Sequence, residues 1–328
     1  MTQNGYRPPS ARNLQQEEPP EVSVLVPICE RHDDLTELYR LYSNELSKLG
    51  KSFEFIFVVA GAFDTALADL SKLRSSDKRI RVTRIPARFG ESTALLEGFR
   101  EARAPLIMTL ASYIQIEPTD LSEVFRAYAE GYDIVVTRRY PRIDPFLNRM
   151  PSALYHFIIR KLTGTPFRDI TSGLRLINRE VLPKLVLYGD LHRFIPIFAL
   201  QRGIRIKEVA VSQRKEDTRV RLVTPGVYLR RILDILTLFF LVKFTRKPFR
   251  FFGLIGSSLF LAGLLLTAYL TAYRLFGHFG LANRPILLLG ILLMVFGIQT
   301  LSIGLIGELI IFSHAREMQD YDIEQMLE

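Results

Sequence analysis

The residues best suited to chemistry in this sequence are arginines that follow predicted β-strands. Arg88 comes shortly after the apolar stretch Ile80–Ile85, and Arg138 and Arg139 follow Asp133–Thr137. The planar guanidinium group matches pairs of phosphate oxygens, so these arginines could together bind a diphosphate without a metal ion. The alternative is that they are solvated loop residues of a basic protein. Both interpretations are open for Arg139.

The elements that must position these residues are strands and helices in alternation. Leu35, Leu38 and Leu46, for example, share one face of a predicted helix. Such alternation predicts an α/β fold with a mostly parallel sheet that is covered by helices on both faces. The predicted strands are Val22–Pro27, Phe53–Val59, Ile80–Ile85, Leu106–Leu110 and Asp133–Thr137, and the predicted helices are Asp33–Leu49, Thr65–Leu73, Glu91–Ala102, Leu121–Ala129 and Pro151–Leu162. The last of these helices suits either a membrane surface or a plain protein surface.

The segments that follow the strands are expected to surround one crevice, because ligands of such sheets bind outside the carboxyl ends of the strands. These segments are Cys29–Glu30, Ala60–Asp64, Arg88–Gly90 and Ala111–Gln115. No set of histidines and cysteines has the spacing of a zinc site.

Two long uncharged stretches lie near the C-terminal end of the sequence. Phe251–Tyr273 and Ile286–Gly307 are each long enough to cross a bilayer as a helix. Basic residues crowd the approach to the first stretch, so the positive-inside rule predicts that the large N-terminal domain and both termini are cytoplasmic. The amphipathic and basic segment Val227–Phe244 is typical of a helix that lies on a membrane surface.

The composition restricts the partners of the chain. Its 328 residues carry a net charge of +9, and much of this charge lies beside the predicted spans. We therefore expect the membrane lipid bilayer to be a partner, and no recognised module supports nucleic-acid binding. Met1–Pro20 is polar and rich in proline, which predicts neither a signal peptide nor fixed structure. The single Cys29 excludes an intramolecular disulfide.

Several motifs follow one another in the order and spacing of a known family. They are Val22–Pro27, Phe89–Gly90, Ala94–Phe99, Gln115–Pro118, Asp169–Arg175, His192–Pro196, Glu208–Val211 and Gly304–Glu308. On these segments the chain resembles the family 2 glycosyltransferases, specifically the membrane-anchored polyprenyl-phosphate sugar transferases related to dolichol-phosphate mannose synthases. The resemblance covers about Val22 to Phe312.

The resemblance implies a nucleotide-binding domain of the GT-A type, a nucleotide-sugar as the donor and a polyprenyl phosphate as the acceptor. The leaving nucleoside diphosphate accumulates negative charge, which a metal ion or fixed cations must stabilise. Mg or Mn is the cofactor expected for the family, because such hard cations are held by oxygen ligands.

Three charged sites of the family are replaced in this sequence. Ala111 and Tyr113 stand where the resemblance implies the two metal-binding aspartates. Val59 and Ala60 stand where it implies an acidic pair that helps to hold the nucleoside. The phosphate-binding Gly-x-Ser-Lys segment of the family has no counterpart in Gln213–Gly226. We therefore assign no metal ligand.

The donor and its phosphates are expected to contact residues around the same crevice. The candidates are Arg88, Arg138, Arg139, Gln115 and Asp64.

The acceptor side of the site is expected to use three residues. Asp169 matches the family's carboxylate near the acceptor, where it could orient or deprotonate the attacking oxygen. Since Thr171–Gly173 follow, a turn or helix-capping aspartate is the alternative. His192 and Arg193 match a family segment near the acceptor phosphate, and a surface pair at the start of a helix is the alternative.

An acidic residue lies near the end of the second predicted span. Glu308 would be costly within a membrane, which makes it a candidate functional residue. Because Gly297, Gly304 and Gly307 permit close helix packing, we favour packing between subunits and expect a homo-oligomer.

Two functions stay open at this point. One is a transferase that inverts the donor anomeric carbon by direct attack of the lipid phosphate, and Asp169 and Arg139 favour it. The other is a catalytically inactive relative that serves as a partner or scaffold for another enzyme or a flippase, and the replaced acids favour it. The predicted organisation is an N-terminal tail (1–20), a GT-A domain (21–226), a basic juxtamembrane helix (227–250), a transmembrane hairpin (251–312) and a cytoplasmic tail (313–328).

Overall fold

The computed structural model describes residues 19–29, 31–87, 90–143, 146–185, 191–218, 232–233, 235–240, 248–277 and 285–314. The chain divides into two compact units, Met1–Pro225 and Gly226–Glu328. The first unit contains the sheet and its helices, and the second contains two long helices.

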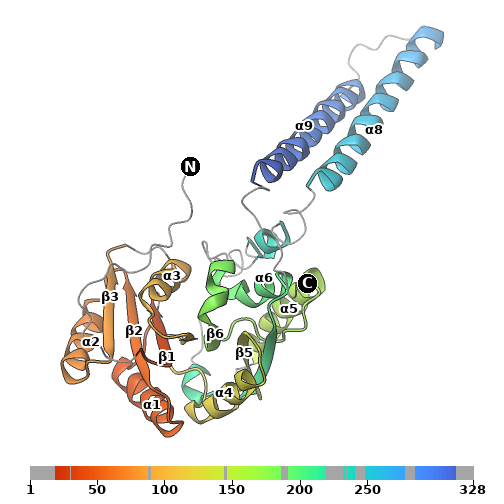
Figure 1. Cartoon of the computed structure of the whole chain (residues 1–328). Coiled ribbons are helices and arrows are strands. Elements are labelled where there is room, and N and C mark those ends of the chain that lie inside the picture. Colours follow the sequence, from red (N-terminus) through yellow and green to blue (C-terminus); the bar gives the residue numbers. More distant parts are fainter. Residues whose placement is uncertain are drawn as a thin grey trace, which may run out of the picture. The chain divides into compact units, whose positions relative to one another are not determined.

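A seven-stranded sheet forms the centre of the first unit, with the strand order β3-β2-β1-β4-β6-β5-β7 (Figure 1). Neighbouring strands are parallel except β6, which is antiparallel to both β4 and β5. The mostly parallel sheet predicted from the sequence is thus confirmed. The strands are β1 Val22–Ile28, β2 Phe53–Ala60, β3 Ile80–Ile85, β4 Leu106–Thr109, β5 Ile134–Arg139, β6 Arg175–Asn178 and β7 Ile206–Val211.

Helices cover both faces of this sheet, which explains why β1 and β2 are almost continuously apolar. Helices α1, α2 and α4 share a hydrophobic core with Val24 and Phe55 on one face. Helix α3 packs on the other face, where a Cβ added to Gly98 would lie 3.2 Å from Leu25 and 3.5 Å from Val58. The helices are α1 Leu35–Lys48, α2 Asp64–Ser76, α3 Glu91–Glu101, α4 Leu121–Ala129, α5 Phe146–Thr163 and α6 Ile195–Gln201.

Strand β6 was not among the predicted strands, and it determines where the site forms. It has only four residues, too few for a clear pattern of alternation. Because it is antiparallel to its neighbours, its first residue, Arg175, pairs with Thr109 on β4 and with Val136 on β5. The segment before β6, residues 164–174, therefore lies at the edge where β4 and β5 end.

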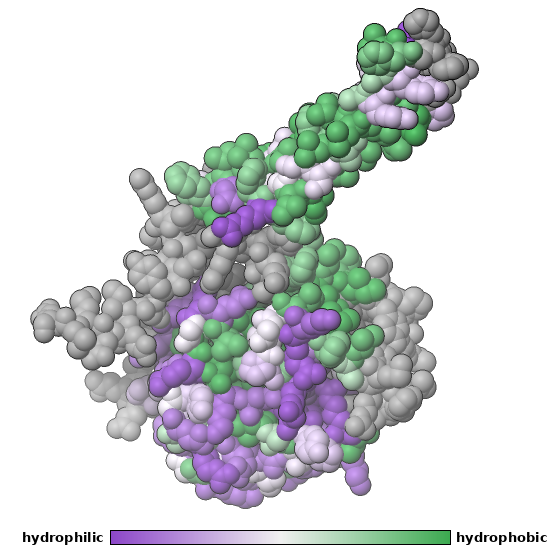
Figure 2. Space-filling view, turned by 90° about the vertical axis from the view of Figure 1, so that its right-hand side faces the viewer, coloured by the Kyte–Doolittle hydropathy of each residue, from purple (hydrophilic) through white to green (hydrophobic). Residues whose placement is uncertain are grey.

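The second unit contains helices α8 Pro248–Gly277 and α9 Pro285–His314. Each includes a stretch of 29 residues whose length and apolar composition would allow it to cross a membrane as a helix. Only 17% of the most apolar 18-residue stretch of α8 is buried, and only 11% of that of α9. Figure 2 shows a mostly hydrophobic surface along this pair. Both expected spans are therefore present as helices. Much of the amphipathic helix expected over Val227–Phe244 lies outside the described residues. The residues described within this segment, 232–233 and 235–240, are helical.

Helices α8 and α9 approach closely through glycines. A Cβ added to Gly297 would lie 2.6 Å from the backbone nitrogen of Phe260 and 2.7 Å from the carbonyl oxygen of Gly256. A Cβ added to Gly304 would lie 2.9 Å from Phe252. The glycines that we expected between subunits are thus used within one hairpin, because the nearest apolar helix is the next one along the chain.

Glu308 lies opposite the beginning of α8. Its carboxylate accepts a hydrogen bond from the backbone N–H of Phe249 at 3.3 Å, and Gly307 packs beside Pro248. The first N–H groups of a helix have no hydrogen-bond partner within the helix, and Glu308 of α9 accepts one of these N–H groups of α8. Glu308 supports helix packing as predicted, but the described contact is within the chain.

Candidate active site

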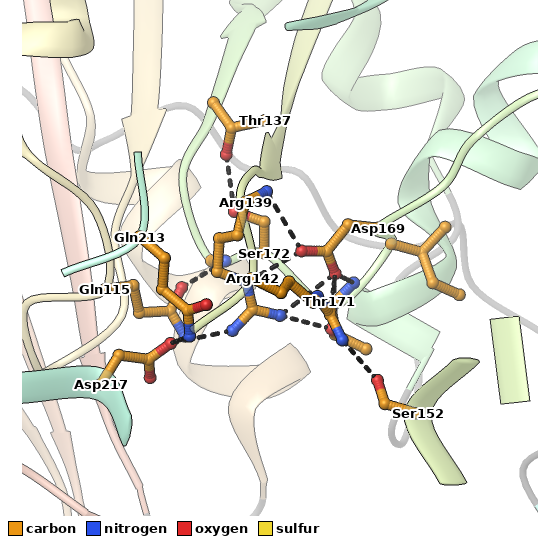
Figure 3. Close-up of polar contacts among 12 residues, drawn as sticks. Gln115, Thr137, Arg139, Arg142, Ser152, Asp169, Thr171, Ser172, Gln213 and Asp217 are labelled. Atoms are coloured by element: carbon orange, nitrogen blue, oxygen red, sulfur yellow. Dashed lines mark hydrogen bonds and ion pairs between the residues drawn. The ribbon is translucent and has the colours of Figure 1, made fainter. Parts of the chain in front are cut away.

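Arg139, the last residue of β5, lies between two buried carboxylates (Figure 3). Its Nε and Nη2 donate to Asp169 at 2.8 and 3.1 Å, and its Nη1 donates to Asp217 at 3.1 Å. Asp169 lies in the segment before β6, and Asp217 lies in the 3-10 turn Lys215–Thr218 after β7. The antiparallel insertion of β6 brings Asp169 to the end of β5, and the parallel pairing of β7 with β5 brings Asp217 to the same edge.

Asp169 has further partners besides Arg139. Arg142 Nη2 lies 2.8 Å from Oδ1, Thr171 Oγ1 donates to Oδ1 at 2.8 Å, and His156 Nε2 lies 3.3 Å from it. Burial acts to raise the pKa of Asp169, but the charge of Arg139, its hydrogen bonds and Arg142 hold this pKa far below its usual range. Asp169 is therefore a carboxylate at neutral pH. It also accepts the backbone N–H of Thr171, as the turn alternative expects, and its role toward an acceptor stays a prediction.

Burial acts to lower the pKa of both Arg139 and His156, but the net shifts of these two groups have opposite directions. Burial acts to lower the pKa of Arg139, but the charges of Asp169 and Asp217 raise it above its usual value. Burial lowers the pKa of His156 to about 4; the charge of Asp169 opposes this shift, and the charges of Arg142 and Arg139 add to it. His156 is therefore neutral at neutral pH, with its Nδ1 2.9 Å from the carbonyl oxygen of Ser152.

A second set of contacts fixes the position of this charged group. Gln213 Nε2 donates to Asp217 at 2.8 Å, and Gln213 Oε1 accepts the N–H of Ile143 at 3.0 Å. Thr137 on β5 donates to the carbonyl oxygen of Leu174 at 2.8 Å. These bonds connect β5, β7 and the segment before β6, so the carboxylates are held by backbone on three sides.

The segment after β4 packs directly against the Asp169 loop. Gln115 Oε1 accepts the N–H of Gly173 at 2.8 Å, and Gln115 Nε2 donates to the Tyr113 hydroxyl at 2.8 Å. A Cβ added to Gly173 would lie 2.9 Å from the backbone nitrogen of Ala111, so only glycine permits this approach. Both ends of the Gln115 amide are thus occupied by protein groups.

The residues at this place do not fit the metal ion that the family resemblance implies. Ala111 offers no oxygen ligand from its side chain, and the Gln115 amide is already hydrogen-bonded. The guanidinium of Arg31 lies over the Tyr113 ring, 4.3 Å from its centroid, and this fixed positive charge would repel a divalent cation. Within the part of the chain that the structure describes, no group of three His, Cys, Asp or Glu residues could hold a metal ion.

Arg31 was not among the site residues predicted from the sequence, and neither were Arg142, His156 and Asp217 at the Asp169 centre. The predicted crevice included Cys29 and Glu30 after the first strand and stopped one residue short of Arg31. Its position three residues beyond the end of β1 was a usable signal, since that loop lies at the ligand edge of the sheet. Glu30 lies outside the described residues.

His192 belongs to a separate polar group at the start of α3. It is buried, its Nδ1 lies 3.2 Å from Ser92 Oγ, and its Nε2 lies 3.2 Å from Glu91. The surface alternative for His192 is therefore wrong, because the 3-10 helix η3, Leu191–Phe194, packs against α3 and buries this ring. Buried Arg175 lies near this group, and burial lowers its pKa to about 10 although the charge of Glu91 opposes this.

The remaining predicted residues have no described contact with Asp169 or Asp217. Arg138 lies over the Tyr140 ring at 5.1 Å, and the exposed Asp64 pairs with Arg84 at 3.5 Å. Arg193 is half-buried in η3. Two further positions, Val59 and Ala60, are fully buried at the end of β2, and Arg88 lies outside the described residues.

Comparison with known proteins defines the class to which this fold and site belong. The family described as "Glycosyl transferase family 2" matches residues 23–186, half of the chain. This chain is a member of glycosyltransferase family 2. Its domain has the mostly parallel, mixed sheet of a GT-A fold, and two apolar helices follow the domain.

Two relatives match along most of their length. The undecaprenyl-phosphate 4-deoxy-4-formamido-L-arabinose transferase of Pseudomonas aeruginosa is 28% identical over 310 residues, which cover 93% of this chain and 90% of that protein. The dodecaprenyl-phosphate galacturonate synthase of Rhizobium johnstonii is 26% identical over 302 residues, which cover 90% and 89%. Among solved structures, glucosyl-3-phosphoglycerate synthase from Mycobacterium tuberculosis matches with a TM-score of 0.49 and 15% identity over 67% of this chain and 79% of that chain.

Proposed function

We propose that this chain transfers a sugar from a nucleotide-sugar to a polyprenyl phosphate at a membrane face. The two relatives are named for sugar transfer involving undecaprenyl or dodecaprenyl phosphate, and their matches extend over about nine-tenths of both sequences. The matched length includes the apolar helices that would keep the domain beside a lipid acceptor.

The observation that carries this proposal is the pairing of buried, ionised Asp169 with Arg139 and Arg142 at the ligand edge of the sheet. An oxygen of the lipid phosphate attacks the anomeric carbon, and the bond from that carbon to the diphosphate oxygen breaks with its electron pair. The acceptor is already an anion, so no proton needs to be removed. Because the pKa of Asp169 is held so low, this carboxylate is a poor base and acts by positioning the two arginines.

The membrane arrangement is part of the same proposal. Basic residues before α8 support a cytoplasmic position for the catalytic-type domain and both termini. A homo-oligomer stays a prediction, and the glycines that suggested it are taken up within the hairpin. The relatives are named as a transferase and a synthase, so they give the inactive scaffold alternative no support.

The test uses the purified full-length protein in detergent. UDP-sugars and GDP-sugars are offered with undecaprenyl phosphate, with Mg or Mn and with a chelator, and formation of the glycolipid is followed. We expect transfer from at least one donor. Failure of the protein to bind any of these nucleotides would refute the transferase proposal and leave the scaffold role.

A further inference from the structure

Two loops that follow neighbouring strands are joined beside the Asp169 centre. Strands β1 and β4 are parallel neighbours, so both end at the same edge of the sheet. The Asp33 backbone N–H donates to the Ser112 carbonyl oxygen at 3.1 Å, and the Ser112 hydroxyl donates to the Arg31 carbonyl oxygen. The backbone of Arg31 is therefore fixed against the segment that carries Ala111 and Tyr113.

The side chain of Arg31 is held in one orientation on this support. Its Nε and Nη2 donate to the Asp33 carboxylate at 3.2 and 2.9 Å, and its guanidinium covers the Tyr113 ring. Asp33 takes one edge of the planar group. No described residue accepts a hydrogen bond from Nη1, and 30% of the side chain is exposed. The other edge of the Arg31 guanidinium, which carries Nη1, is therefore open to a ligand in the crevice.

The charges at this place suit a diphosphate. In the family pattern, two aspartates and a divalent ion together carry no net charge, and they present the positive ion to the phosphates. Arg31 and Asp33 also carry no net charge together, and they present a guanidinium edge. Arginine donates to phosphate oxygens through two parallel bonds, and a bound carboxylate fixes its orientation beforehand.

We propose that Arg31 binds the diphosphate of the nucleotide in the place of a divalent metal ion, with Tyr113 and Asp33 as its positioning residues. This inference rests on the proposed function, since it assumes that a nucleotide enters this crevice. It assigns a role to one of the two departures in the segment after β4. Tyr113 supplies a ring face for a cation where an aspartate would have bound the metal.

The chain contains a matched control for Arg31. Arg79 donates from Nε and Nη2 to Asp77 at 3.1 and 2.7 Å, and its guanidinium lies 4.4 Å from the centroid of the Phe53 ring. It has the same types of contact, but it precedes β3 and so lies at the opposite edge of the sheet. Arg79→Ala therefore reproduces the loss of an arginine, its ion pair and its ring contact away from the crevice.

The experiment measures UDP and GDP binding to the full-length protein by calorimetry, in EDTA and in Mn. We expect wild type to bind one nucleotide with similar affinity in both conditions. Arg31→Ala should weaken binding by about tenfold or more, Arg31→Lys should lie between, and Arg79→Ala should match wild type. Glycolipid formation is measured on the same samples.

The outcomes separate this inference from the proposed function. Wild-type binding that needs Mn, or equal affinities for Arg31→Ala and wild type, would overturn the role of Arg31 while transfer activity still stands. An absence of all nucleotide binding by wild type would overturn the proposed function and this inference together.

Discussion

Replacing Asp169 with Asn should destabilise the domain strongly, because it leaves buried arginines without their main counter-charge. Asp169 is 2% exposed and Arg139 is 9% exposed, and their ion pair is supported by Arg142 and Thr171. Removing one partner of such a pair costs about 3 to 5 kcal/mol. Since Arg139 keeps Asp217, we expect about 3 kcal/mol, which corresponds to a fall of about 6–12 °C in the melting temperature of a domain this size.

The assay is thermal unfolding of the full-length protein, and the control is Glu130→Gln. Glu130 forms an ion pair with Lys207 at the surface, where such a pair contributes about 0 to 1 kcal/mol. The pKa of Asp169 is depressed in the folded state, so its stabilisation is present above its unfolded pKa near about 4 and is lost as the pH falls below it. A melting temperature for Asp169→Asn no lower than that of the control at neutral pH would refute the structural argument for this centre.

Three further predictions test other parts of the structure. The pKa of His156 is about 4 when folded and about 6.5 when unfolded, so the unfolded state binds more protons as the pH falls between these values. Wild type should therefore lose about 2 kcal/mol between about pH 7 and about pH 5 from this group, and His156→Gln should abolish that part of the loss in thermal unfolding; an unchanged pH profile would contradict a neutral His156. In the hairpin, Gly297→Ala should lower thermal stability by about 1 to 3 kcal/mol because its Cβ meets Phe260 and Gly256 backbone. Gly253→Ala, whose Cβ would have Phe249 side-chain atoms at 3.6 Å as its nearest neighbours, is its control, and equal stabilities would argue against close packing of α8 and α9. Finally, Ala111→Asp with Tyr113→Asp should weaken nucleotide binding without making it depend on Mn, because Arg31 pairs with a new carboxylate and is lost to the diphosphate, and adding Arg31→Ala should create Mn dependence. Mn-dependent nucleotide binding by the double variant, with Arg31 still present, would show that Arg31 does not prevent a metal ion from binding beside these two positions.

Much of the scaffold could be predicted because its pattern is local. Apolar runs such as Phe53–Val59 and the helical spacing of Leu35, Leu38 and Leu46 indicate strands and helices without knowledge of their neighbours. The two apolar stretches predict α8 and α9 for the same reason. Strand β6 could not be predicted in this way, because its four residues gain their strand conformation from pairing with β4 and β5 on both sides.

The candidate site divides along the same line. The motif around Asp169 could be recognised from residue types and spacing, but its partners come from distant segments. Arg139 lies 30 residues before Asp169, and Asp217 lies 78 residues after Arg139. Spacing alone left two roles open for Arg139, a phosphate ligand or a solvated loop residue. Its burial contradicts the solvated role, and its hydrogen bonds to Asp169, Asp217 and Thr171 hold its guanidinium in place.

The sequence by itself determined the class of this protein, the two membrane-length helices and the absence of aspartates at Ala111 and Tyr113. Those features depend on residue identity and on periodicity along the chain. Only the tertiary structure decided which residue contacts Tyr113. The parallel pairing of β1 with β4 brings Arg31 over Tyr113, a contact between residues 82 positions apart for which no local pattern exists. Charge at a site depends on which segments meet there, and sheet topology determines that meeting.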